Sequence, residues 1–327
     1  MIDAAIVGLG RWGQALVESV QQNSDRIRFV RAVTRTPDNA EAFIRRTNLT
    51  VDVDMAATLK DPTVAAVVLA TPHSQHADQI IAAAHAGKHV FVEKPFALNK
   101  ASAELALRAC EQAGVTVGVG FNRRFLPSFA ELKRRLESGQ IGTLMHVEGI
   151  FSVNIVSDVG AWRRFASESP AGGMTSLGIH VLDLMIAVAS EVTDVTAMSH
   201  RRAISWDIDD TTAVLSRHAS GASGYLCTVA QGARLFMLRA YGSKGWLEMR
   251  GEQQLVMCSA PPTGMGGEES QVSYEPFNTL KAELETFAEA IRSKRPFPIS
   301  PQQIVNGIAA LEAIQTSSAE RRAVTVA

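Results

Sequence analysis

At 327 residues the chain is long enough for two domains, and its 46% hydrophobic and 20% charged residues are ordinary for a globular protein. A formal net charge of -1, without a polybasic run, argues against nucleic acid or a membrane surface as a partner. No apolar stretch reaches the roughly 18 residues of a membrane-spanning helix, and the apolar run 4–9 follows no basic leader, so we expect a cytoplasmic protein.

Short apolar runs alternate with helical stretches in the first part of the chain. Strands are predicted at 2–7, 29–33, 65–70, 89–92 and 116–119. Helices are predicted at 11–22, from the cap Thr36-Pro37, at 73–86, and from the cap Asn99 to residue 113. Such alternation produces a doubly wound parallel sheet, so residues 1–121 are expected to form an α/β Rossmann domain.

The pattern changes after Phe121. Helices are predicted at 125–138 and 173–189, a β run at 144–153, and successive β runs without helices between 192 and 257. Two further helices end the chain, the second beginning with a capping box between Ser300 and Gln303. Because strands that follow one another without crossovers pair antiparallel, residues 122–327 are expected to form an α+β domain with a mostly antiparallel sheet.

A glycine motif joins the first predicted strand to the first predicted helix. Gly8 permits a tight turn, Gly10 lets the backbone approach a pyrophosphate, and Gly13 lets helix and strand pack closely. The free N–H groups of the helix N-terminus then face the phosphates. The motif predicts a dinucleotide site, with a purely structural turn as the alternative; its residues are Gly8, Leu9, Gly10, Arg11, Trp12 and Gly13.

The residues after the second strand favour NADP(H) over NAD(H). An NAD enzyme usually carries Asp or Glu there to bind the ribose 2′-hydroxyl, whereas this chain has Thr34-Arg35-Thr36. Arg35 can pair with a 2′-phosphate, and the two hydroxyls can donate to it. The alternative is a solvated Arg35 in an enzyme that accepts NAD(H).

Several spaced motifs resemble the glucose-fructose oxidoreductase / inositol dehydrogenase / rhizopine catabolism (Gfo/Idh/MocA) family over essentially the whole length. The motifs are "AIVGLGRWG" at 5–13, "LATPHSQHAD" at 69–78, "GKHVFVEKP" at 87–95, "GFNRRFLP" at 120–127, "AWRR" at 161–164, "AGGMTSLGIHVLDLM" at 171–185 and "ELETFAEAI" at 283–291.

This resemblance implies a Rossmann domain followed by a domain with a large open sheet that covers the nicotinamide and often mediates oligomers, here a homodimer or homotetramer. It implies hydride transfer to or from a sugar, polyol or related small molecule. By position it implies cofactor contacts from Thr71, Pro72, His76, Glu93, Lys94, Asn122, Trp162 and Arg163.

Lys94 and His180 are the candidate catalytic residues. Lys94 follows a parallel strand, where open α/β sheets bind ligands, and can protonate or hydrogen-bond the reacting oxygen; its alternative role is to anchor the cofactor ribose. A histidine can exchange a hydroxyl proton near neutral pH. The spacing of Ser176, His180 and Asp183 predicts one shared helix face, on which Asp183 holds the helix or His180.

One residue departs from the family pattern. Family dehydrogenases generally carry Asp where this chain has Ser176, so the carboxylate that would pair with His180 or the substrate is missing. The substrate contacts are expected from Lys94, Asn154, Arg163, Ser176 and His180. No metal site is expected, since no His, Cys and Asp set has ligand spacing.

Two alternatives to a dehydrogenase remain open. The missing carboxylate leaves room for a sensor that binds a dinucleotide without turnover. The family's glycosidase branch, which eliminates a group through a transient redox step with tightly held cofactor, is the other.

Overall fold

The computed structural model describes residues 1–155, 161–261 and 266–327, which form two compact units. The first unit comprises Met1–Asn122 and Asn278–Ile304, and the second comprises Arg123–Phe277 and Val305–Ala327. The expected division assigned all of 122–327 to one domain. The structure differs because helix α8 (Thr279–Ser293) packs on the first sheet, where the Phe287 ring lies 5.6 Å from that of Phe91.

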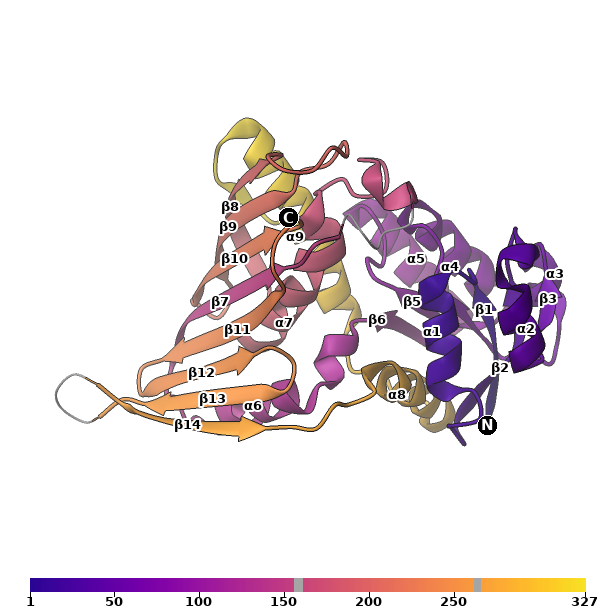
Figure 1. Ribbon diagram of the computed structural model, residues 1–327, viewed down its shortest axis with the longest axis horizontal. Helices are drawn as coiled ribbons and strands as arrows, with labels where there is room; N and C mark the ends of the chain where they lie inside the picture. Colours follow the sequence, from indigo (N-terminus) through magenta and orange to yellow (C-terminus); the bar gives the residue numbers. More distant parts are fainter. Residues whose placement is uncertain (156–160, 262–265) are drawn as a thin grey trace. The chain divides into compact units, whose positions relative to one another are not determined.

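The first unit contains the predicted parallel sheet, with strand order β3-β2-β1-β4-β5-β6 (Figure 1). Its strands pair in parallel throughout, so the doubly wound α/β prediction is confirmed. The short edge strand β3 escaped prediction. The bounds are β1 (Ile2–Val7), β2 (Ile27–Val33), β3 (Thr50–Asp52), β4 (Ala66–Leu69), β5 (His89–Glu93) and β6 (Val117–Gly120).

Helices of the first unit cover this sheet, with α1 beside α8 and α4 beside α5. The Asn99 cap is confirmed, since its side chain accepts from the Ser102 N–H at 2.8 Å. The helix start at Thr36-Pro37 is confirmed in position, since Pro37 begins a four-residue 3₁₀ turn with Thr36 at the N-cap, but the Thr36 side chain makes no capping bond. The bounds are α1 (Arg11–Val20), η1 (Pro37–Ala40), α2 (Glu41–Thr47), α3 (Met55–Lys60), η2 (His73–Gln75), α4 (His76–His85) and α5 (Lys100–Ala113).

The second unit is built on a nine-stranded sheet with the order β14-β13-β12-β11-β7-β10-β9-β8-β15 (Figure 1). Among the described strands of this second sheet, only β10 and β7 pair in parallel, which confirms a mostly antiparallel sheet. The bounds are β7 (Leu144–Ser152), β8 (Val192–His200), β9 (Thr211–His218), β10 (Ser223–Val229), β11 (Leu235–Gly242), β12 (Gly245–Arg250), β13 (Gln254–Ser259), β14 (Glu268–Ser273) and β15 (Val324–Thr325).

The helix predicted at 173–189 is interrupted. It begins as a π turn, η5 (Met174–Gly178), and continues as α7 (Ile179–Ala189), which packs on the sheet. Glycines allow this approach: a Cβ on Gly178 would lie 2.6 Å from a Thr228 methyl group, and one on Gly149 would lie 2.1 Å from a Val181 methyl group. The remaining helical elements are η3 (Asn122–Phe125), α6 (Pro127–Glu137), η4 (Ala161–Arg164) and α9 (Pro301–Glu320).

The capping box before α9 is confirmed. The Gln303 N–H donates to the Ser300 hydroxyl at 3.2 Å, and the Ser300 N–H donates to the Gln303 side chain at 3.4 Å. Among the described residues, no helix has the length and hydropathy to cross a bilayer. Those same residues contain no group of three or more His, Cys, Asp or Glu side chains that could hold a metal ion.

Candidate active site

The glycine turn after β1 has the geometry of a dinucleotide cradle. Gly8 has φ +95°, and a Cβ there would lie 2.5 Å from the Ala70 carbonyl oxygen. A Cβ on Gly13 would lie 2.0 Å from the Gly8 carbonyl oxygen, whereas a Cβ on Gly10 would meet only open space. Leu9 is buried, and the exposed Arg11 and Trp12 begin α1. Gly8 and Gly13 therefore lie where there is no room for a side chain, whereas Gly10 faces open space, where a pyrophosphate would approach.

This difference predicts opposite effects for two alanine variants. Gly10 has φ -71° in extended backbone, so Gly10→Ala should change the free energy of unfolding by less than about 0.5 kcal/mol. Its methyl group fills the phosphate approach, so dinucleotide affinity should fall about tenfold or more. Gly13→Ala places a methyl group against backbone and should cost about 1–3 kcal/mol of stability.

Thermal unfolding and fluorescence titration of both variants check the prediction. Equal stability losses in the two variants would contradict it.

The residues expected at the cofactor's 2′ position follow β2. Thr34 is half-buried, whereas Arg35 and Thr36 are exposed. The Thr34 N–H donates to the Asp52 carbonyl oxygen at the end of β3, at 3.1 Å. The edge strand thus supports the segment that would meet the adenosine ribose.

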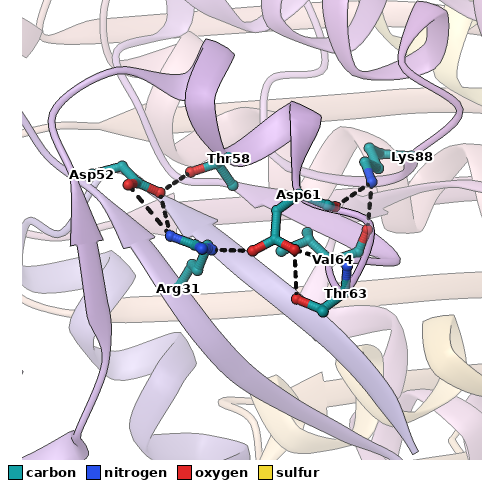
Figure 2. Close-up of polar contacts among 7 residues, drawn as sticks. All are labelled: Arg31, Asp52, Thr58, Asp61, Thr63, Val64 and Lys88. Atoms are coloured by element: carbon teal, nitrogen blue, oxygen red, sulfur yellow. Dashed lines mark hydrogen bonds and ion pairs between the residues drawn. The ribbon is translucent and has the colours of Figure 1, made fainter.

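A polar network behind this segment was missed by the sequence analysis (Figure 2). The guanidinium of Arg31, on β2, binds the Asp52 carboxylate at 3.1 Å and the Asp61 carboxylate at 2.5 Å. Hydrogen bonds from the Thr63 hydroxyl and N–H, together with Arg31, lower the pKa of Asp61 to about 2. The available signal was Arg31 within the apolar run 29–33 of the predicted strand.

His76 lies in the interior of the first unit. It has no exposed surface, and its Nδ1 and Nε2 atoms lie 2.7 Å and 3.0 Å from the carbonyl oxygens of Pro95 and Thr71. His76 therefore joins the loops that follow β4 and β5. Thr71 and Pro72 are half-buried at the first of these loops, and the Thr71 hydroxyl is bonded to Gln79 of α4 at 2.6 Å.

Glu93 and Lys94 lie at the carboxyl end of β5, between the ends of β4 and β6. Lys94 is half-buried, and its peptide bond to Pro95 is cis. Glu93 is buried against β6, where a Cβ on Gly120 would lie 2.7 Å from its Oε1 atom. This edge of the sheet also carries the glycine turn, and it is where open α/β sheets bind ligands.

Asn122 supplies a second sign that a dinucleotide fits. Its Nδ2 donates to the Thr279 hydroxyl of α8 at 3.0 Å, which fixes the amide plane. Its Oδ1 is buried and accepts from no donor within the described part of the chain. A buried acceptor of this kind is suited to a ligand hydroxyl or amide. Gly10, the α1 N-terminus, Lys94 and Asn122 would thus hold the dinucleotide.

In the second unit, Ser176 lies within the π turn η5, whereas His180 and Asp183 lie on α7. Asp183 instead binds Arg124 of η3, whose Nε and Nη2 atoms donate to its carboxylate at 2.7 and 2.8 Å. His180 is 5% exposed, and its ring centroid lies 6.4 Å from that of Phe151. Asp183 therefore has a structural partner other than His180.

The remaining site candidates lie on loops of the second unit. Trp162 and Arg163 form η4, where the guanidinium lies 4.1 Å from the Trp162 ring centroid. The Ser169 hydroxyl donates to the Arg163 carbonyl oxygen at 2.9 Å. Asn154 follows β7 and is exposed, so it is accessible to a ligand.

Arg123 was another omission from the sequence analysis. Its guanidinium lies 4.8 Å and 5.1 Å from the ring centroids of Phe151 and Phe236, and it pairs with Glu252 at 3.2 Å. Phe236 and Glu252 also line a cavity of about 480 Å³, which does not include His180. Arg123 thus connects the aromatic side of His180 to that cavity.

Comparison with known families agrees with this fold. The family described as "Oxidoreductase family, NAD-binding Rossmann fold" (GFO_IDH_MocA) matches residues 2–121, and its C-terminal domain matches residues 129–248. The chain belongs to the Gfo/Idh/MocA family of dinucleotide-binding oxidoreductases.

Individual relatives extend the comparison. The scyllo-inositol 2-dehydrogenase (NAD(+)) of Bacillus subtilis is 31% identical over 60% of this chain and 56% of its own length. The myo-inositol 2-dehydrogenase of Thermotoga maritima is 26% identical over 98% of this chain and 97% of its own. Levoglucosan dehydrogenase in complex with NADH and L-sorbose shares the fold, with a TM-score of 0.91 at 22% identity over 100% of this chain and 99% of its own.

Proposed function

We propose that the protein is an NADP(H)-preferring dehydrogenase or reductase of a sugar, polyol or related carbonyl compound. The observation that carries the proposal is the position of Lys94, half-buried at the sheet edge that also presents the glycine cradle. The inositol and levoglucosan dehydrogenases among its relatives support this class of substrate.

We assign the proton chemistry to Lys94 and His180. When bound, a nicotinamide would supply the hydride chemistry, as acceptor from a carbinol carbon or donor to a carbonyl carbon. In the oxidation direction the hydroxyl proton leaves as the C=O bond forms, and an uncharged Lys94 amine accepts it. In reduction the Lys94 ammonium returns a proton to the oxygen. His180 can exchange the substrate hydroxyl proton, and Ser176 can hydrogen-bond the substrate but carries no charge.

The preference for NADP(H) rests on the tip of β2. Thr34-Arg35-Thr36 offers a guanidinium and two hydroxyls and no carboxylate, and Arg35 and Thr36 are exposed to a ligand. Two of the relatives reported above carry NAD(+) or NADH in their descriptions, so the preference proposed here differs from the cofactor named for those two proteins.

Titration of the wild-type protein with NADPH and NADH tests the preference. We expect a lower Kd for NADPH, with a difference that shrinks as salt screens the 2′-phosphate. Tighter binding of NADH would contradict it.

We further propose that two or four copies assemble through the second sheet. Met198 and Leu215, 69% and 59% exposed, lie on the adjacent strands β8 and β9, where Leu215 pairs with Tyr225 of β10. Exposed apolar side chains on neighbouring strands are typical of an interaction surface. Light scattering checks the mass, and a monomer at working concentration would contradict the proposal.

A further inference from the structure

The Arg31 network includes Asp52 (Figure 2), whose main chain is hydrogen-bonded to the segment that would bind the 2′ end of the cofactor. The Thr34 N–H donates to the Asp52 carbonyl oxygen, so Asp52 is adjacent to the start of Thr34-Arg35-Thr36. The Asp52 carboxylate is largely buried and is held by two donors, Arg31 at 3.1 Å and the Thr58 hydroxyl at 2.6 Å.

Arg31 is the cation that both carboxylates of this network share. Asp52 and Asp61 carry two negative charges, and Arg31 pairs with both. The Lys88 ammonium donates instead to the main-chain carbonyl oxygens of Asp61 and Val64, both at 2.8 Å. Asp52 therefore depends on Arg31 for its cationic partner.

Two further acidic residues lie near Thr34-Arg35-Thr36 in the sequence, and both are more exposed to solvent than Asp52. Asp38, in η1, is exposed. Asp54 is exposed and caps α3 by accepting from the Ala56 N–H at 3.0 Å. Solvent and salt screen exposed carboxylates well, whereas a partly buried one acts over a longer distance.

We infer that Arg31 is a specificity-determining residue that neutralises Asp52 and so keeps the tip of β2 favourable for a 2′-phosphate. The inference rests on the proposed NADP(H) preference. Arg31 need not touch the phosphate for this effect. With Arg31 in place the Asp52 carboxylate has a cationic partner, and without Arg31 a carboxylate without that partner remains beside Thr34 and weakens the attraction of Arg35 for a phosphate.

Two substitutions that change the local charge in opposite directions test the inference. Arg31→Met should weaken NADPH binding about three- to tenfold and leave the Kd for NADH within about twofold, because only NADPH carries the 2′-phosphate. Asp52→Asn is nearly isosteric and keeps an oxygen for Thr58, and it should shift the Kd ratio toward NADPH. If Arg31 and Asp52 had only a structural role, each substitution would weaken the binding of NADPH and NADH together, and the two variants would not shift the ratio of the Kd values in opposite directions.

A matched control and a double variant complete the experiment. Arg28 lies on the same strand and pairs with Asp3 at 2.6 Å, so Arg28→Met removes an equivalent charge away from the tip and should leave the ratio unchanged. Arg31→Met combined with Asp52→Asn should restore the wild-type ratio to within about twofold.

The outcomes separate this inference from the proposed function. If wild type binds NADH more tightly, the proposed preference fails, yet the opposite shifts of the two variants still measure the Arg31 effect. If wild type prefers NADPH but the two variants shift the ratio together or not at all, the inference is overturned. Asp52→Asn keeps Arg31 in place and decides the question should Arg31→Met fold poorly.

Discussion

Lys94→Met should lower kcat by about 10²- to 10⁴-fold while leaving the Kd for the dinucleotide within a few-fold of wild type. Methionine keeps much of the side-chain volume at this half-buried position but cannot exchange a proton. If Lys94 acts on the reacting oxygen, its loss raises the barrier of the chemical step and leaves the glycine cradle intact. Single-turnover absorbance measurements at saturating cofactor separate these two quantities.

Lys100→Met is a suitable control for this prediction. Lys100 begins α5 and lies 3.7 Å from Glu104 in an i,i+4 pair, so its removal should leave kcat unchanged. A normal single-turnover rate in Lys94→Met would remove Lys94 from the chemistry. A rate loss explained entirely by weaker cofactor binding would assign Lys94 to the ribose instead.

Asp183→Ala should destabilise the protein by about 3–5 kcal/mol, because it strands the Arg124 guanidinium without its partner in a buried site. The Arg124 side chain is 10% exposed and that of Asp183 is 6% exposed, so water replaces little of the lost bonding. Asp183→Asn retains one acceptor and should cost less. The denaturant midpoint of the transition that includes α7 measures both effects.

The same variants test whether Asp183 is structural or catalytic. A structural Asp183 predicts that Asp183→Asn loses stability and keeps kcat within about tenfold, since His180 remains on the same helix. Unchanged stability combined with a hundredfold or greater loss of kcat would contradict the structural role.

The local signals in the sequence were sufficient for the framework of the fold. Apolar runs of strand length fixed the core strands of the first sheet, and the side chains of Asn99 and Ser300 fixed two helix starts. The three glycines also have the individual roles that their spacing predicts, because a turn of this kind is decided by local backbone geometry.

Contacts between distant segments could not be predicted in this way. Phe287 packs on Phe91, which assigns α8 to the first unit, and no local sequence pattern indicates this contact. The π turn at 174–178 lies where Gly178 approaches Thr228 of β10, and the helical period of the sequence did not indicate it. Arg124 reaches across 59 positions to Asp183, and this pairing redefines the role of Asp183.

Local signals in the first unit placed Lys94 at the end of β5 and the glycines in a turn between β1 and α1. They did not indicate that the buried His76 ring lies between the carbonyl oxygens of Pro95 and Thr71. The sequence showed that His76 follows the β4 loop. It could not show which atoms the ring would face.

The most direct test of the central claim is turnover by the wild-type protein with a panel of sugars, polyols and aldehydes, followed at the nicotinamide absorbance with product analysis. We predict that at least one compound is converted with one dinucleotide oxidised or reduced for each product formed, and that Lys94→Met abolishes this signal. Tight NADPH binding without turnover across the panel would contradict the account and indicate a sensor. Product release without net change in the dinucleotide would also contradict it and indicate elimination.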